Sequence, residues 1–236
     1  MSLTPHSLSR PPHILITAGP THEPIDAVRF IGNRSSGRMG TALAHEAAAR
    51  GLRVTLLLGP APVAPTDSRV SVKRFRTCED LRGLLREHVA AADVLIMAAA
   101  VADYRPKVDP AFFGGKFRRK SENLTLELEP TPDLLAEVGA TRRDDQLFVG
   151  FALEPRAEML EAATAKMKRK RIDMVVANPL ETMDSDSIEA TILFADSTPQ
   201  ATFAKRPKSE AAGWILDHVM RTYETRVPPT AALRGR

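Results

Sequence analysis

The segment VRFIGNRSSGRMG, which begins at Val28, gathers polar side chains and glycines that could bind an anion. Three of its residues are types that favour the N-cap of a helix, namely Asn33, Ser35 and Ser36. Backbone N–H groups at a helix start attract phosphate, and Gly37 and Gly40 would let a ligand approach the backbone closely. The segment therefore indicates either a phosphate cradle at a loop-to-helix junction or residues that only cap a helix.

The glycines of this segment do not match the dinucleotide-binding fingerprint. In that motif G-x-G-x-x-G follows the first strand at once, and an acidic residue about 20 residues later holds the ribose. Here Gly32, Gly37 and Gly40 lie roughly fifteen residues or more past the first expected strand, and the second ends in Leu57-Leu58-Gly59 without an acid. An NAD(P)-dependent oxidoreductase remains an alternative that fits poorly, and a nucleotide-binding module without activity is another.

Other candidate ligand contacts lie farther along the chain. The small residues Ala98–Ala102 precede Asp103, and small side chains at the carboxyl end of a parallel strand leave room for a ligand. Lys166 and Lys170 are one helical turn apart, so both ammonium groups could reach one anion. Phe151 could pack against a base or ribose, or belong to the core.

The elements that must position these residues alternate along the chain. Strands are expected at 13–17, 53–59, 70–75, 93–100, 146–152, 173–178 and 189–195, and helices at 36–50, 79–91, 132–140, 155–170 and 208–224. Met39, Leu43 and Ala47 have helical spacing, and Gly51 is a plausible C-cap. The alternation predicts an α/β, Rossmann-like fold with a mostly parallel sheet and helices on both faces.

One stretch interrupts this pattern. Residues 103–131 contain prolines, a glycine pair and a basic run, and end in the alternating segment NLTLELE, which we expect to be a strand. We predict an inserted arm or hairpin that contributes to a dimer contact. The domain would span residues 12–225, between a flexible N-terminus (1–11) and a disordered tail (226–236).

Composition narrows the class of protein. The net charge of +4 comes from two short runs that hold nine basic groups, starting at Lys116 and at Lys166, so it is local rather than the broad basic face of a nucleic-acid-binding protein. The single cysteine, Cys78, fits a reducing compartment. No apolar stretch is long enough for a membrane span, and no His/Cys cluster predicts a metal site. We expect a cytoplasmic protein that binds neither nucleic acid nor membrane.

Six blocks carry a resemblance to a known family. ITAGPTHEPIDAVRFIGNRSSGRMG, AAAVADYRP, GGKFRRK, PTPDLL, VGFALE and KMKRKRIDMVVANP have the order and spacing found in phosphopantothenoylcysteine synthetase, the ligase of coenzyme A biosynthesis. The resemblance covers about residues 12–225. It implies that 4′-phosphopantothenate and L-cysteine are joined through an acyl-nucleotidylate, with CTP favoured over ATP as co-substrate, Mg²⁺ arriving with the triphosphate and pyrophosphate released.

The resemblance also implies residue roles. Asn33 would contact the acyl intermediate, and Arg29 would act on its formation or turnover from the neighbouring subunit of a homodimer. The nucleotide-binding positions would be Gly19, Ser35, Gly37 and Gly40 in the backbone cradle, Ala99, Ala100 and Asp103 in the pocket, Lys116, Lys166 and Lys170 at the phosphates, and Pro132, Asp133, Leu134, Leu135 and Phe151 as further contacts.

A decarboxylase partner follows from the same resemblance. In many bacteria this family is the C-terminal half of a fusion with a flavin-dependent decarboxylase. Only about a dozen residues precede the first expected strand. We therefore expect the decarboxylase on a separate chain, and no flavin bound here.

Overall fold

The computed structural model describes residues 10–107, 115, 116, 118, 121, 123–183, 185–196 and 200–226. Its main feature is an eight-stranded sheet with the order β12-β11-β10-β9-β6-β1-β4-β5. The strands are β1 His13–Ala18, β4 Arg53–Leu58, β5 Val70–Arg74, β6 Val94–Met97, β9 Leu147–Glu154, β10 Met174–Pro179, β11 Ser187–Phe194 and β12 Ala201–Pro207. The six strands from β10 to β5 are parallel, and only β11 and β12 run antiparallel to their neighbours. The expected mostly parallel α/β sheet is confirmed.

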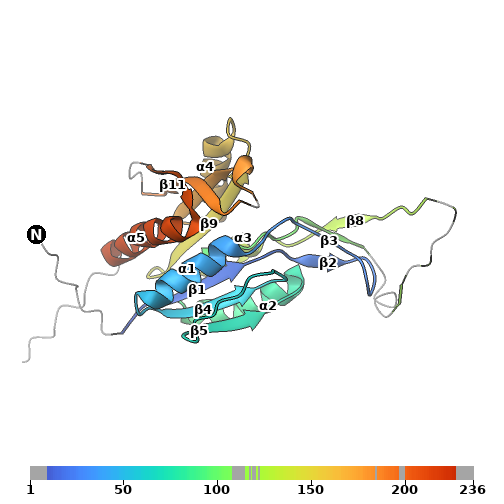
Figure 1. Cartoon of the computed structure of the whole chain (residues 1–236), viewed down its shortest axis with the longest axis horizontal. Helices are drawn as coiled ribbons and strands as arrows, with labels where there is room; N and C mark the ends of the chain where they lie inside the picture. The colour runs from blue at the N-terminus through green and yellow to red at the C-terminus, as the bar shows by residue number, and fades with distance from the viewer. Residues whose placement is uncertain are drawn as a thin grey trace, which may run out of the picture.

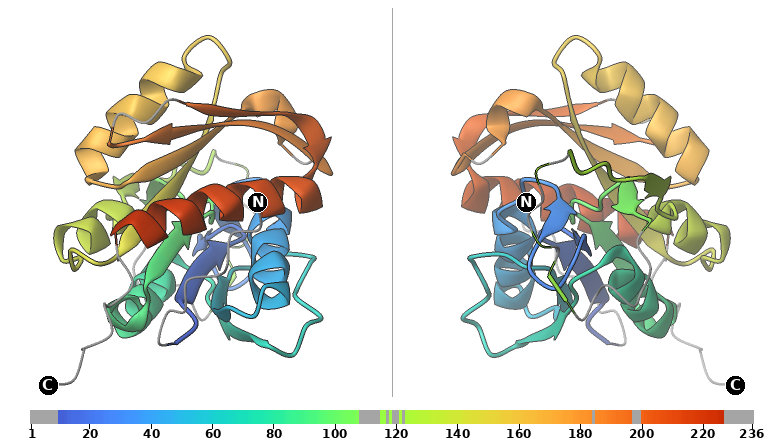
Figure 2. Two further views of the ribbon diagram at one scale, coloured as in Figure 1. Left: turned by 90° about the vertical axis from the view of Figure 1, so that its left-hand side faces the viewer. Right: turned by 90° about the vertical axis from the view of Figure 1, so that its right-hand side faces the viewer.

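Helices cover both faces of this sheet, as expected (Figures 1 and 2). Helices α1 (Arg38–Ala49) and α5 (Lys208–Arg226) share one apolar core with one face. Helices α2 (Cys78–His88), α3 (Leu134–Ala140) and α4 (Met159–Lys170) share a second core with the other face. Short 3₁₀ turns, η1 (Val89–Ala91) and η3 (Leu180–Thr182), follow α2 and β10. No helix within the described ranges is long and apolar enough to cross a membrane.

The strand order places a ligand crevice between β1 and β6. From β1 the chain winds outward through β4 and β5, then returns to β6 on the other side of β1 and continues through β9 and β10. The connection that leaves β1 therefore runs toward β4, whereas the connection that leaves β6 runs the opposite way, toward β9. In open α/β sheets, ligands bind at the carboxyl ends of strands at such a reversal of order.

Two small antiparallel sheets stand beside the main one (Figure 1). They pair β2 (His22–Pro24) with β3 (Phe30–Gly32), and β7 (Tyr104–Pro106) with β8 (Leu128–Pro130). The β7–β8 pair closes the base of the segment predicted as an arm. Its expected strand NLTLELE is wrong for residues 123–127, because only Leu128–Pro130 form a strand. Residues 108–114, 117, 119, 120 and 122 of the arm, and the predicted end segments at 1–9 and 227–236, lie outside the described residues.

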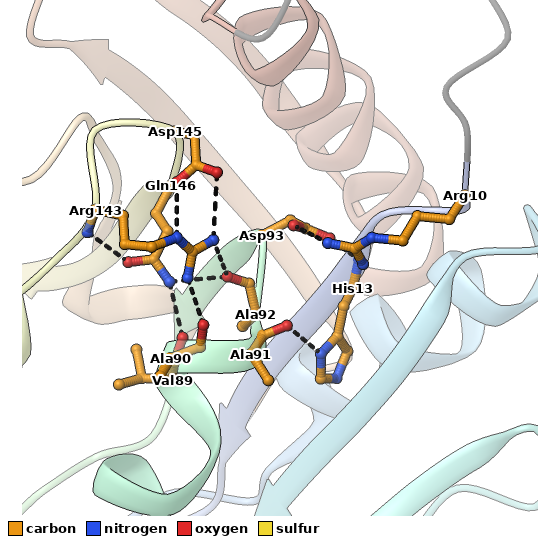
Figure 3. A network of polar contacts seen from close by, with 10 residues as sticks. All are labelled: Arg10, His13, Val89, Ala90, Ala91, Ala92, Asp93, Arg143, Asp145 and Gln146. Atoms are coloured by element: carbon orange, nitrogen blue, oxygen red, sulfur yellow. Dashed lines mark hydrogen bonds and ion pairs between the residues drawn. The ribbon is translucent and has the colours of Figure 1, made fainter.

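Buried carboxylates organise the amino edge of the sheet, opposite the crevice. Asp93 accepts hydrogen bonds from the backbone N–H of His13 at 2.7 Å and from Arg10 at 2.9 Å (Figure 3). Asp173 accepts the N–H of Phe148 and the guanidinium of Arg226, each at 2.7 Å. Hydrogen-bonded and ion-paired carboxylates can be buried, whereas unpaired ones cost several kcal/mol. The last residue of α5 is thereby fixed to the sheet.

Candidate active site

A pocket of about 560 Å³ opens at the carboxyl edge of the parallel strands. It is lined by the segment 33–40 at the start of α1, by residues 97–103 after β6, by the start of α3, and by side chains of β9, α4, β10 and η3. The predicted site residues found together in its lining are Asn33, Ser35, Gly37, Gly40, Ala99, Ala100, Asp103, Pro132, Asp133, Leu134, Leu135, Phe151, Lys166 and Lys170. Arg29, Gly19 and Lys116 are not in the lining.

Helix α1 starts without a side-chain cap. Its N-cap is Gly37, which adopts a left-handed conformation with φ 70°, and no side chain makes a capping hydrogen bond. Of the two alternatives left open by the sequence, the one in which Asn33, Ser35 or Ser36 only caps the helix is therefore wrong. No side chain caps the helix, and residues 37–40 line the pocket, so the N–H groups of the first turn are available there to bind an anion.

Glycines 37 and 40 serve close packing of this junction as well as access. A Cβ at Gly40 would lie 2.5 Å from the Cβ of Ala18 on β1, so α1 approaches the strand more closely than any side chain permits. A Cβ at Gly37 would lie 2.9 Å from the Cβ of Ala61. Gly40 was expected to let a ligand approach the backbone. Its missing side chain serves at least in part to let α1 approach β1.

The alanine loop after β6 is held by backbone bonds to the loop after β1. Ala98 N–H donates to the carbonyl of Thr17 at 3.2 Å, and Ala100 N–H donates to that of Gly19 at 2.9 Å. Gly19 has φ 80° and so supplies a turn that a side chain would strain. It supports the pocket wall from behind instead of lining the pocket.

Asn33 joins the α1 segment to this loop. Its Nδ2 donates to the carbonyl oxygen of Val101 at 3.0 Å, and the side chain is exposed at the pocket mouth. An amide nitrogen carries two hydrogens, so one N–H remains for a ligand oxygen. Asp103 is also exposed there, and its backbone carbonyl accepts the N–H of Thr131 at 2.9 Å.

Lys166 brings a largely desolvated cation to the opposite wall. Its ammonium donates to the backbone carbonyl of Phe151, at the inner end of the pocket. Burial, followed by repulsion from the charge of Lys170, lowers the pKa of Lys166 to about 8. A phosphate bound beside this ammonium would favour its charged form.

Lys170, one turn further along α4, is paired with an acid at the start of α3. Its Nζ lies 2.9 Å from Oδ1 of Asp133, and its side chain is only 14% exposed. The same carboxylate caps α3 by accepting the N–H of Ala136 at 3.1 Å. Partial burial opposes the shift, but the hydrogen bond from Lys170 lowers the pKa of Asp133. Asp133 therefore fixes the position of Lys170, and α3 to α4.

Arg29 and Lys116 lie together away from the pocket. Arg29 sits in the β2–β3 turn, where its Nε donates to Asp26 at 3.0 Å. Ala27 N–H in the same turn donates to the carbonyl of Gly115 at 3.0 Å, and Lys116 follows as an exposed residue. Both of these predicted site residues are exposed in the single chain.

Several lining residues had not been predicted. Asn178, Thr182, Met183 and Lys208 come from the β10 and α5 side, and Arg38 forms an ion pair of 2.9 Å with Asp186 across it. Asn178 directly precedes a proline at a strand end, the one sequence pattern that could have singled it out. The described residues contain no group of three or more His, Cys, Asp or Glu side chains arranged for a metal ion.

Comparisons with known proteins agree with this architecture. A family model described as "DNA/pantothenate metabolism flavoprotein C-terminal domain" matches residues 10–223. A crystal structure of the C-terminal domain of the coenzyme A biosynthesis bifunctional protein CoaBC is 34% identical, has a TM-score of 0.76 and covers 91% of this chain and 96% of its own.

Two curated relatives match along most of this chain. The bifunctional protein CoaBC of Mycobacterium bovis is 40% identical over 220 residues, covering 88% of this chain and 51% of the relative. A protein named cysteine/cysteine sulfinic acid decarboxylase, from an unknown prokaryotic organism, is 45% identical over 168 residues, covering 71% of this chain and 46% of the relative. The chain spans about half the length of the curated relatives that it matches.

Proposed function

The chain belongs to the family of DNA/pantothenate metabolism flavoprotein C-terminal domains, and from this membership we propose that it joins 4′-phosphopantothenate to L-cysteine in coenzyme A biosynthesis. The observation that carries the proposal is the pocket itself. It sets two lysines of α4 and the uncapped start of α1 around a space that also holds Asn33 and Asp103. Such a site can hold a triphosphate against an acyl group.

The first step in this proposal activates the carboxylate of phosphopantothenate. A carboxylate oxygen attacks the α-phosphorus of the nucleotide, the bond from that phosphorus to the bridging oxygen breaks, and pyrophosphate leaves with the electron pair. Lys166 and Lys170 neutralise the charge that builds on the phosphates, and the N–H groups of α1 orient them.

The second step forms the amide. The amine of cysteine attacks the carbonyl carbon of the acyl-nucleotidylate, and CMP leaves as the carbon–oxygen bond to its phosphate breaks. The nitrogen then loses its extra proton to solvent. The free N–H of Asn33 is assigned to the oxyanion that develops on the carbonyl oxygen, because amide donors stabilise such charge.

CTP is the preferred nucleotide in this proposal, with ATP as the competing co-substrate. Mg²⁺ enters as part of the nucleotide, held mainly by phosphate oxygens and water, since Mg²⁺ prefers such ligands to dedicated protein cages. Phe151, half-buried beside Lys166, and the start of α3 are assigned to the nucleoside.

We further propose a cytoplasmic homodimer with shared sites. Arg29 and Lys116 face outward from the hairpin and arm, which supports their delivery to the pocket of a second copy. A decarboxylase that consumes the product is the other proposed partner, because the CoaBC relatives are named bifunctional and the chain matches about half their length.

The test is a reconstituted reaction. Purified protein, phosphopantothenate, cysteine and Mg²⁺ are incubated with CTP or ATP, and pyrophosphate, CO₂ and the mass of the pantothenate product are followed, omitting one substrate at a time. We expect sustained pyrophosphate release only when nucleotide, phosphopantothenate and cysteine are all present, at most about one equivalent per site when cysteine is omitted, and a product enlarged by one cysteine. Nucleotide binding without pyrophosphate release would indicate an inactive module, whereas CO₂ release from cysteine alone would favour the decarboxylase named among the relatives.

A further inference from the structure

A second cavity lies on the other side of α3 from the active-site pocket. It has a volume of about 610 Å³ and is formed by α2, η1, α3 and the loop that leads to β9. Ligand sites for small molecules commonly have volumes of about 300–1,000 Å³. None of the steps proposed above uses this cavity.

Its floor is apolar and belongs to the core. Leu85 of α2 and Leu134 and Val138 of α3 line it, and each of these side chains is at least nine-tenths buried. Val89 of η1 adds a further apolar contact at the side. An occupant with an apolar body would extend the second core, because burial of apolar surface away from water is favourable.

Hydrogen bonds hold the walls of the cavity in place. Arg82 on α2 makes two parallel bonds of 2.8 Å to the carboxylate of Glu137 on α3. Figure 3 shows the other wall, where Gln146 donates to the carbonyls of Val89 and Ala92 at 2.8 Å each, and Arg143 donates to that of Ala90. The space between the helices is therefore preformed, which lowers the cost of binding.

Arginines dominate the charged part of the lining, which contains Arg82, Arg86, Arg142 and Arg143 and a single acid, Glu137. Arg142 and Arg143 are paired with Asp173 and Asp145, which lie outside the lining, at 2.7 Å and 2.9 Å. Arg82 uses most of the hydrogen-bonding capacity of Glu137, and Arg86 approaches it only to 4.0 Å with a side chain that is 62% exposed. Among the described residues, Arg86 is the lining arginine best placed to meet a new anion, and guanidinium groups bind carboxylate and phosphate in bidentate fashion.

We propose that this cavity binds a small amphipathic anion, an apolar chain or ring that ends in a carboxylate or phosphate. Leu134 lines both cavities, and Asp133, which precedes it, holds Lys170 in the active-site pocket. Helix α3 has only seven residues. An occupant packed against Leu134 therefore contacts the helix whose capping residue, Asp133, holds Lys170.

A fluorescent probe tests the site without relying on the proposed reaction. Anilinonaphthalene sulfonate, an apolar anion whose emission rises on binding, is titrated into the full chain, and octanoate and octanol compete for it. We expect about one bound dye per chain, displaced by octanoate at a concentration at least tenfold lower than by octanol. Equal displacement by both would overturn the proposed anion selectivity.

Two pairs of matched variants test whether the dye binds in this cavity. Arg86→Glu should weaken binding at least tenfold, whereas Arg221→Glu, the same charge change on α5 at the other face of the sheet, should not. Ala140→Trp, which fills the cavity from an exposed lining position, should abolish binding, and Ala64→Trp, at an exposed position outside both cavities, should not. Equal effects within either pair, or displacement of the dye by pyrophosphate, would overturn the proposal.

Discussion

The ammonium of Lys170 lies 2.9 Å from the carboxylate of Asp133, so a cation assigned to phosphate is already paired before any ligand arrives. The pair joins the last turn of α4 to the first residue before α3 and limits the freedom of the lysine side chain. An ordered cation loses less entropy when it binds an anion.

We predict that Lys170→Ala weakens CTP binding by about 10–100-fold, since hydrogen bonds to charged groups contribute roughly 1.5–3 kcal/mol. Binding of phosphopantothenate should change much less. Isothermal titration of each substrate measures both, and Lys168→Ala, an exposed lysine on the same helix, is the control. Equal losses for the two substrates would argue against a triphosphate role.

Nucleotide affinity should fall as the pH rises above about 8. Burial and the charge of Lys170 lower the pKa of Lys166 to about 8, with Glu154 and Asp133 as opposing charges, so the ammonium loses its proton in this range and no longer attracts phosphate. If only the charged form binds, affinity falls about tenfold between pH 7 and pH 9. Lys166→Met should bind weakly at both pH values, and an unchanged slope in this variant would assign the titration to another group.

Asn33→Ala should reduce turnover by about 10²–10³-fold, the usual effect of removing one oxyanion donor. Nucleotide binding should persist, because Asn33 contacts the loop at Val101 and not the lysines. Single-turnover measurement of pyrophosphate release and of product would show which step is slowed. Unchanged turnover would remove Asn33 from the mechanism.

Mixing two inactive variants tests whether sites are shared. If Arg29 serves the pocket of its partner, a mixture of Arg29→Ala and Asn33→Ala chains forms heterodimers with one intact site, and about a quarter of the activity returns for a twofold dimer. If Arg29 acts within its own chain, no activity returns. Size-exclusion chromatography with light scattering verifies the dimer, and a fully active monomer would exclude the shared site.

Cys78 should resist thiol reagents in the native protein. Burial, aided by the nearby charge of Glu23, raises its pKa to about 11, and the side chain has no exposed surface. Thiolates are the reactive form, so we expect no reaction with Ellman's reagent at pH 8 until denaturant is added. Rapid native reaction would mean that the N-terminal end of α2 opens.

Helices and strands whose apolar residues repeat regularly over many positions could be predicted from the sequence. The spacing of Met39, Leu43 and Ala47 predicted α1, and Gly51 directly follows its C-cap with φ 76°. The short strands β2 and β3 have three residues each, with Pro24 in one and Gly32 in the other, so no alternation was visible. Strand β12, at the sheet edge, is mostly exposed and rich in basic residues, and for that reason did not resemble a strand.

The candidate site was predictable in its residue types more than in its contacts. Lysines one turn apart must share a helix face, which placed Lys166 and Lys170 together in the pocket. The serines ahead of the helix left a side-chain cap open as an alternative, but a left-handed backbone at Gly37 starts α1 without one. A Cβ at Gly37 would crowd Ala61 and one at Gly40 would crowd Ala18, and such constraints from distant segments leave no local pattern.

The contact between Gly40 and Ala18 limits how this pocket can be re-engineered. Because even one methyl group at position 40 would overlap β1, the proposed anion-binding end of the pocket tolerates almost no sequence variation there. A library aimed at a new nucleotide should therefore keep residues 18, 37 and 40 constant and diversify the wall formed by Phe151, Asn178 and Met183. The preference for the nucleobase can then change, while the backbone that is proposed to bind the phosphates keeps its geometry.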